Sequence, residues 1–364
     1  MPLLVTGCAA HETRPTQRVP TATVAIARNA DNTASITVTY REAANVFEIM
    51  DNVSSWLPGK CDEEYRAYWN DRFGITPADE QRFASYKQLR KRSYPRPPDG
   101  QDGSDPRTAS LFGPVKPVDR FAAAFYDSQS LDEAFVKLGD VATAQEIAEL
   151  KAFYAVYRPQ YESLLIESKA YLAIASATST KLEEAHADAY ATGLAQFYGV
   201  TNLPRFTALY VWWPPVEHVT ANSRDRFLLL KYNPAKHGNG AASDIDIPIH
   251  EFVHYASAHQ SEEQKRALTR TFLAGCDPTA DVKPVKILEE PLAVAHQKLF
   301  LSTADPQHFD ASVPWYGGDR WIDPFAKALF VQVKEARATG RTIDDALMTS
   351  AAKSCAALYA ARSR

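Results

Sequence analysis

Apolar and polar residues alternate near the start of the chain. Residues 22–40, ATVAIARNADNTASITVTY, show this alternation on both sides of Asp31-Asn32, which predicts a β-hairpin with a polar turn. From residue 41 to about residue 93 the spacing of apolar residues becomes helical. A stretch rich in proline and glycine, residues 93–119, follows. It predicts a long loop or linker, because these residues interrupt helices.

The rest of the chain changes from helices to strands and back to helices. Residues 129–198 predict two or three long amphipathic helices. The runs RFTALYVWWP and DRFLLLKYNP bracket PVEHVTANS and predict an antiparallel pair of strands. Further helices are expected from near Pro248 and over residues 284–303, 324–338 and 343–362, the last capped by Thr342. This order of elements predicts an α+β fold that is mainly helical.

The pattern also divides the chain into four regions. Residues 1–21 are expected to be a signal remnant or tether, and residues 22–119 a hairpin and helical region that ends in the loop rich in proline and glycine. Residues 120–200 form a second helical region, and residues 201–364 a region that carries the candidate chemistry.

The composition and net charge of the chain bear on which kinds of molecule it could bind. The chain has 364 residues, 45% of them hydrophobic and 23% charged, with a formal net charge of −4. So small a charge gives no electrostatic reason to expect binding to nucleic acid or to an anionic membrane surface. The apolar stretches all fall short of the roughly eighteen residues that a membrane-spanning helix needs.

The N-terminus, MPLLVTGCAAHETRPTQ, contains Val5-Thr6-Gly7-Cys8, which resembles the lipobox of bacterial lipoproteins. The basic and apolar parts that precede a lipobox are cut short here, so an accidental match is the alternative. The resemblance implies a lipid anchor at Cys8 and a location in the bacterial cell envelope, on the periplasmic or outer-membrane side, or secretion.

The other cysteines, Cys61, Cys276 and Cys355, are widely spaced and form no CxxC motif. This spacing argues against a zinc ribbon or a dithiol redox motif. One disulfide with one free thiol and three buried thiols are both compatible with the sequence, which does not select a pair.

The strongest chemical signal is the HExxH motif at His250–His254. On a helix, residues four apart share a face, so both imidazoles can bind one metal ion. Glu251 can face a water at that metal and act as its general base. The alternative is a helix with two histidines that serve only structure.

A zinc site with two histidines needs a third protein ligand. Ser257 and Gln260 stand where a metzincin would have glycine and histidine, and His259 lies about 100° round the helix. Downstream, Glu290-Pro291-Leu292-Ala293 resembles the motif of the gluzincin zinc peptidases, in which a glutamate is followed after two residues by a small residue. Glu289 is the alternative ligand, although that register ends at Leu292, and Pro291 departs from the glycine found in many gluzincins.

The resemblance covers about residues 205–330 and implies a zincin-like fold. Such a fold has a small antiparallel sheet whose edge strand lines the substrate cleft, and residues 224–234 are the candidate edge strand. A gluzincin often stabilises the oxyanion with a tyrosine or histidine, and Tyr316, followed by two glycines, is the favoured candidate. Weaker candidates are His218, His237, His296 and His308. Carboxylates that could orient a metal-bound histidine are Asp244, Asp246, Asp319 and Asp323.

The resemblance therefore implies a zinc metallopeptidase with one Zn²⁺ per chain, held by His250, His254 and Glu290. Glu251 would be its general base, Tyr316 would stabilise the oxyanion, and a peptide or protein would be its substrate. The alternatives are an envelope scaffold protein that binds zinc without turnover, a zinc hydrolase of a non-peptide amide, and a structural protein without zinc. The sequence does not indicate an oligomeric state.

Overall fold

The computed structural model describes residues 33–56, 62–93, 110–116, 118–166, 168–217, 220–237, 245–307 and 309–362. Its strands are β1 (Ile36–Tyr40), β2 (Phe206–Trp212), β3 (Thr220–Arg224) and β4 (Phe227–Tyr232). The helices of the first half are α1 (Glu42–Ser54), α2 (Glu63–Phe73), α3 (Pro77–Ser93), α4 (Arg120–Tyr126), α5 (Leu131–Leu138), α6 (Ala144–Leu165), α7 (Ser168–Glu184) and α8 (Ala187–Phe197). Those of the second half are α9 (Pro234–His237), α10 (Asp246–Ala258), α11 (Glu262–Gly275), α12 (Pro284–Ile287), α13 (Glu289–Ala304), α14 (Ile322–Ala338) and α15 (Asp345–Arg362).

The fold is α+β and mainly helical, as predicted, but its sheet is mixed. The four strands lie in the order β1-β2-β4-β3, with β2 parallel to both β1 and β4 and only β3 antiparallel to β4. The prediction of a small antiparallel sheet, with β2 and β4 as an antiparallel pair, is therefore wrong. Both strands are buried along their whole length, which is typical of parallel strands inside a sheet.

The predicted cleft-edge strand is also wrong. Residues 227–232 form β4, which lies between β2 and β3, whereas the half-buried strand β3 lies at the edge of the described sheet. The sequence TANSR of β3 is short and polar, and such a sequence is easily taken for a loop. The first strand and the turn of the predicted hairpin lie outside the described residues, while its second strand is β1, paired with β2.

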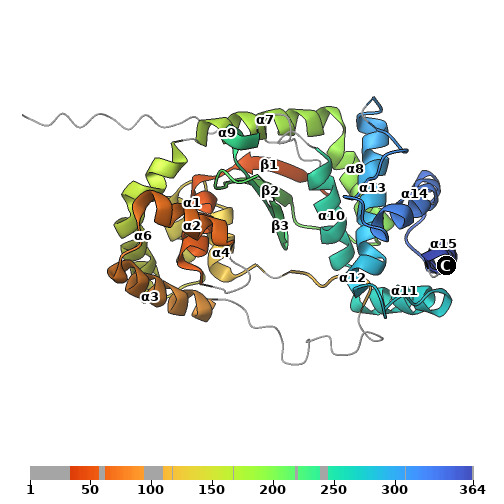
Figure 1. Ribbon diagram of the computed structural model, residues 1–364, viewed down its shortest axis with the longest axis horizontal. Helices are drawn as coiled ribbons and strands as arrows, with labels where there is room; N and C mark the ends of the chain where they lie inside the picture. Colours follow the sequence, from red (N-terminus) through yellow and green to blue (C-terminus); the bar gives the residue numbers. More distant parts are fainter. Residues whose placement is uncertain are drawn as a thin grey trace, which may run out of the picture.

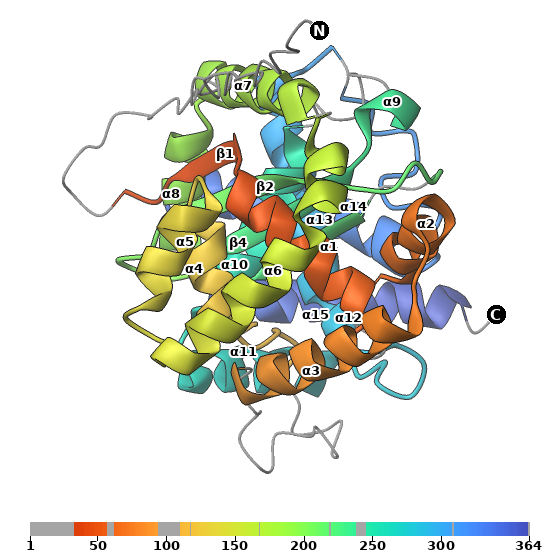
Figure 2. The same ribbon diagram turned by 90° about the vertical axis from the view of Figure 1, so that its left-hand side faces the viewer.

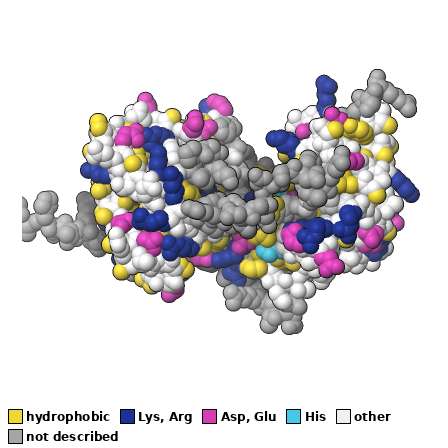
Figure 3. Space-filling view, turned by 90° about the horizontal axis from the view of Figure 1, so that it is seen from below, with side chains coloured by type: hydrophobic (Ala, Val, Ile, Leu, Met, Phe, Trp, Pro, Cys, Tyr) yellow, Lys and Arg dark blue, Asp and Glu magenta, His cyan; other side chains and the backbone are white. Residues whose placement is uncertain are grey.

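The helices lie on two sides of this sheet (Figure 1). Helices α1 to α6 gather on one side, and α10 to α15 gather on the other (Figures 1 and 2). Helix α1 packs on β2, α7 on β1, and α10 on α13. A histidine side chain is visible near the middle of the described surface, beside acidic and hydrophobic side chains (Figure 3). Within the described segments, we find no helix with both the length and the apolar character required to cross a membrane.

A disulfide between Cys276 and Cys355 joins the end of α11 to α15. This finding selects one of the pairings that the sequence left open, and Cys8 and Cys61 lie outside the described residues. The start of α15 corrects another prediction. Asp344, rather than Thr342, caps the helix, because its carboxylate accepts a hydrogen bond of 2.8 Å from the amide of Leu347.

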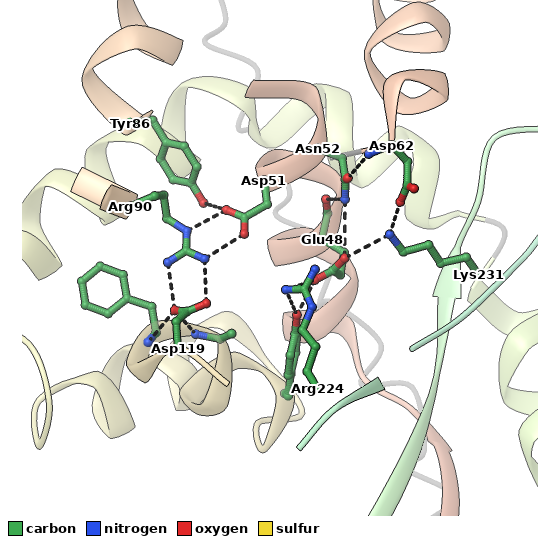
Figure 4. Close-up of polar contacts among 12 residues, drawn as sticks. Glu48, Asp51, Asn52, Asp62, Tyr86, Arg90, Asp119, Arg224 and Lys231 are labelled. Atoms are coloured by element: carbon green, nitrogen blue, oxygen red, sulfur yellow. Dashed lines mark hydrogen bonds and ion pairs between the residues drawn. The ribbon is translucent and has the colours of Figure 1, made fainter. Parts of the chain in front are cut away.

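Buried ion pairs join helices α1, α3 and α4 (Figure 4). The Arg90 guanidinium, 0% exposed, lies between Asp51 and Asp119 at 2.8 and 2.9 Å. Asp119 also caps α4 through the amides of Phe121 and Ala122, both at 3.0 Å. Every charge of this group is therefore paired, which offsets the cost of removing it from water.

A second buried group ties α1 to strands β3 and β4 (Figure 4). The Glu48 carboxylate lies 3.4 Å from Arg224 on β3 and 3.5 Å from Lys231 on β4. Lys231 also pairs with Asp62. Helix α1 is thus joined to both β3 and β4 by ion pairs.

Candidate metal centre

Helix α10 carries the HExxH motif and packs one face into the core. Ile249, Phe252, Val253 and Ala256 are fully buried, which fixes the rotation of the helix. The other face directs the two histidines toward one point, and their Nε2 atoms are 3.2 Å apart. The predicted helix and the convergence of His250 and His254 are confirmed.

Helix α13 brings Glu290 to the same point. Its Oε1 lies 3.2 Å from Nε2 of His250, and its Oε2 lies 3.4 Å from Nε2 of His254. One ligand atom from each residue falls within 4.8 Å of the others, so the three could hold a single metal ion. Two imidazole nitrogens and a carboxylate oxygen suit a transition metal such as zinc. The residues present therefore fit the metal that the sequence implies.

Glu289 lies behind His254 and not in the ligand group. Its Oε1 is 3.0 Å from Nδ1 of His254, and the Ser257 hydroxyl donates to the same oxygen at 3.0 Å. The Gly113 amide donates to Oε2 at 2.6 Å. Because Nδ1 of His254 is hydrogen-bonded to Glu289, the Nε2 atom of His254 faces the other two possible ligands. The sequence alternative of Glu289 as a ligand does not fit this geometry.

The carboxylates expected to orient a histidine have other partners. Asp246 contacts Gln297 and Lys298, while Asp319 accepts hydrogen bonds from the first amides of α14. Asp323 accepts a hydrogen bond from the amide of Trp315 and pairs with Lys327, and Asp244 lies outside the described residues. Sequence reasoning missed Glu289 in this role because it was considered only as a ligand. Two adjacent glutamates on one helix point about 100° apart, so one can bind the metal while the other binds its histidine.

The electrostatics of the group follow from these contacts. Burial alone would lower the pKa of His254, but hydrogen bonds to Glu289 and Glu290 raise it to about 10. Burial would raise the pKa of Glu290, but hydrogen bonds from the two histidines hold it well below its usual range. A metal ion bound here would therefore displace a proton shared by His254 and Glu290, whose nitrogen and oxygen atoms already face one another.

Glu251 lies beside the ligand group and faces the edge strand. The Ser223 hydroxyl on β3 donates a hydrogen bond to Oε2 of Glu251. Glu251 lines a cavity of about 370 Å³ together with His250, His254 and Glu290. The carboxylate is thus next to the possible metal ligands and lines the cavity, a placement from which a carboxylate can accept a proton from a bound molecule.

Tyr316 reaches the centre from the loop before α14. Burial, the charge of Glu290 and a hydrogen bond to Glu290 raise the pKa of its phenol. The two residues after it, Gly317 and Gly318, have φ of 48° and 75°, a left-handed backbone that favours glycine. This turn, closed by a 2.8 Å hydrogen bond from the Asp319 amide to the Tyr316 carbonyl, brings the ring over the cleft.

The cleft extends to both sides of the centre. His250 and Tyr316 line the 370 Å³ cavity and also a second cavity of about 740 Å³. The larger cavity is lined mainly by apolar and aromatic side chains, among them Tyr210, Leu230, Tyr232, Ile247 and Trp315. Strand β3 borders both cavities, through Thr220 and Ala221 on one side and Ser223 on the other.

The other histidines whose side chains the structure describes take no part in the ligand group. His259 contacts the Tyr255 carbonyl at 2.8 Å and Asp225 at 3.4 Å. His296 is fully buried against the rings of Phe197 and Tyr198, away from the cleft. The other three weaker candidates for oxyanion stabilisation, His218, His308 and the side chain of His237, lie outside the described residues.

Comparison with protein-family models, with curated proteins and with solved structures finds no match to this chain. The assignment of a function therefore depends on the geometry of the site.

Proposed function

We propose that this protein is a zinc-dependent metallopeptidase of the gluzincin type, with one Zn²⁺ held by His250, His254 and Glu290. The observation that carries the proposal is the convergence of these three donors beside Glu251 in an open cleft. A structural metal site is usually closed by four protein ligands, whereas three ligands facing a cavity leave room for water and substrate.

The chain supplies the acid, the base and the oxyanion donor. Bound zinc would polarise the scissile carbonyl and make a water easier to deprotonate. Glu251 would take the proton of the attacking water and deliver it to the leaving amine. The Ser223 hydroxyl, which donates to Glu251, would hold the carboxylate toward the cleft. The Tyr316 phenol would donate a hydrogen bond to the oxygen that becomes negative.

The shape of the cleft supports a peptide or protein substrate. Strand β3 is at the edge of the described sheet and runs past both cavities, so an extended peptide could pair with it. The larger cavity would accept bulky apolar side chains of that peptide. A small non-peptide amide would use only part of this space, so we place an amide hydrolase second.

A bacterial envelope or secreted location belongs to the same proposal. The Cys276–Cys355 disulfide suits an oxidising compartment, which supports this location. The lipid anchor expected at Cys8 lies outside the described residues and stays a prediction.

The decisive experiment combines metal content with peptide cleavage. Purified protein should contain one zinc per chain by plasma mass spectrometry and should cleave members of a mixed peptide library. Glu251→Gln should keep the zinc and lose about 100- to 10,000-fold in turnover, because only the base is removed. Full zinc without cleavage would favour the scaffold alternative. Absence of zinc after incubation with the metal would contradict the whole proposal.

A further inference from the structure

Residues 110–116, here called the 110–116 segment, belong to the N-terminal half but lie against the C-terminal helices. Leu111 and Phe112 are 0% and 1% exposed. The Leu111 amide donates to the hydroxyl of Thr269 on α11 at 3.1 Å. The segment is therefore anchored by apolar burial and by a hydrogen bond immediately before it reaches the metal centre.

Gly113 occupies a position in which a side chain would be crowded. A Cβ at this residue would lie 3.1 and 3.4 Å from the two carboxylate oxygens of Glu289. Pro114 follows and favours an extended backbone at Gly113. The absence of a side chain lets the Gly113 amide approach Glu289 to 2.6 Å.

The contacts form a chain from the segment to the ligand group. Gly113 binds one oxygen of Glu289, and His254 and Ser257 share the other. Each oxygen of this buried carboxylate is thus satisfied, and the carboxylate plane is fixed. Without the Gly113 amide, Oε2 would lose a donor in a place with little access to water.

We propose that the Gly113 backbone amide is a positioning group for the metal centre. It holds Glu289 so that His254 keeps its Nε2 toward the metal, and the zinc affinity of residues in the C-terminal half therefore depends on the 110–116 segment. The proposal rests on the zinc site of the proposed function. Pro114, Val115 and Lys116 continue the segment along the 370 Å³ cavity, so the same segment also forms one wall of the cleft.

The test is the zinc affinity of full-length variants, measured by competition with a chromophoric chelator. Gly113→Pro removes the amide donor, and Gly113→Ala keeps it but crowds the carboxylate. Loss of a group that orients a metal ligand typically weakens metal binding about 10- to 100-fold, which is the loss expected for Gly113→Pro. A smaller loss is expected for Gly113→Ala. The matched control is Gly139→Ala at the end of α5, where the added Cβ also meets an oxygen, at 3.0 Å, but outside the cleft.

A spectroscopic measurement separates positioning from loss of fold. The visible absorption of the cobalt(II)-loaded protein reports the geometry of the ligands, and it should change in the Gly113 variants but not in Gly139→Ala. Circular dichroism of the metal-free proteins verifies that each is folded. Zinc affinities of both Gly113 variants within about twofold of the wild type would overturn the inference. Wild-type protein that binds zinc but cleaves no peptide would overturn the peptidase proposal alone, and wild-type protein that binds no zinc would overturn both.

Discussion

Glu289 and Glu290 are adjacent in the chain and face different partners. Glu290 contacts the Nε2 atoms of both histidines, and Glu289 contacts Nδ1 of His254. The motif of glutamate, two residues and a small residue favoured Glu290 and left Glu289 as the alternative; Ala293, the small residue, is fully buried in α13. The sequence could not show that Glu289 binds a histidine, because the Gly113 amide that orients it comes from 176 positions away.

Substitution of each glutamate should therefore give a different result. Glu290→Ala should abolish stoichiometric zinc binding, because it removes one of three ligands. Glu289→Ala should retain zinc but bind it about 10- to 100-fold more weakly, because His254 loses its orienting partner. Zinc content by plasma mass spectrometry and affinity by chelator competition distinguish the two. Equal loss in both variants would mean that the roles assigned here are wrong.

Substitution of Tyr316 provides a second test of a role assigned to a single residue. Tyr316→Phe removes the hydroxyl that we assign to the developing oxyanion and leaves the ring in place. Loss of one such donor costs about 100- to 1,000-fold in kcat, so we expect that fall with little change in KM and with full zinc content. Steady-state kinetics on a cleaved peptide measure it. An unchanged kcat would remove Tyr316 from the chemistry.

At the scale of elements, residue patterns located the helices better than the strands. The helix expected from near Pro248 is α10, and the expected segments near residues 324 and 343 are α14 and α15. The prediction of strand direction failed because β2 and β4 are buried along their whole length, and their sequences carry no clear alternation that would mark a solvent face. Their parallel pairing depends on β3 returning between them in the chain, and that strand is only half buried.

The Asp51–Arg90–Asp119 group should be essential for holding α1, α3 and α4 together. Asp119→Ala leaves a buried guanidinium with one carboxylate fewer, so we expect a loss of about 3–5 kcal/mol in the free energy of unfolding. Urea denaturation measures it. Asp132→Ala, at an exposed position of α5, is the control and should change stability by less than about 0.5 kcal/mol. A loss for Asp119→Ala no larger than that of the control would show that the group contributes little.

We also expect the stability that Asp119 contributes to depend on pH. Burial would raise the pKa of Asp119, but the charge and hydrogen bonds of Arg90 hold it below its ordinary value. A lowered pKa in the folded state means that the stabilisation is complete above the unfolded pKa of about 3.9 and disappears as pH falls through the folded value. The stability difference between wild type and Asp119→Ala should therefore be constant near neutrality and shrink below about pH 4. A difference that grows on acidification would contradict this assignment.

At the scale of the whole molecule, the disulfide joins the end of α11 to α15. Cys276 and Cys355 are 79 positions apart, and the segment between them contains α13 and Tyr316. Replacing both with serine should lower the free energy of unfolding by about 2–5 kcal/mol, because the unfolded chain gains freedom. Zinc content should remain, since neither cysteine is a ligand. Identical denaturation curves for the oxidised and reduced wild type would contradict the prediction.

The parallel pairing of β1 with β2 also has a consequence for the order of events during biosynthesis. Ile36 pairs with Phe206, and β1 neighbours no other described strand. A ribosome must therefore synthesise more than half of the chain before β1 meets its partner, and the glutamates of α13 emerge later still. Contacts so distant in sequence form slowly. The residues of the candidate metal centre consequently come together late, only after Glu290, at position 290 of 364, has been synthesised.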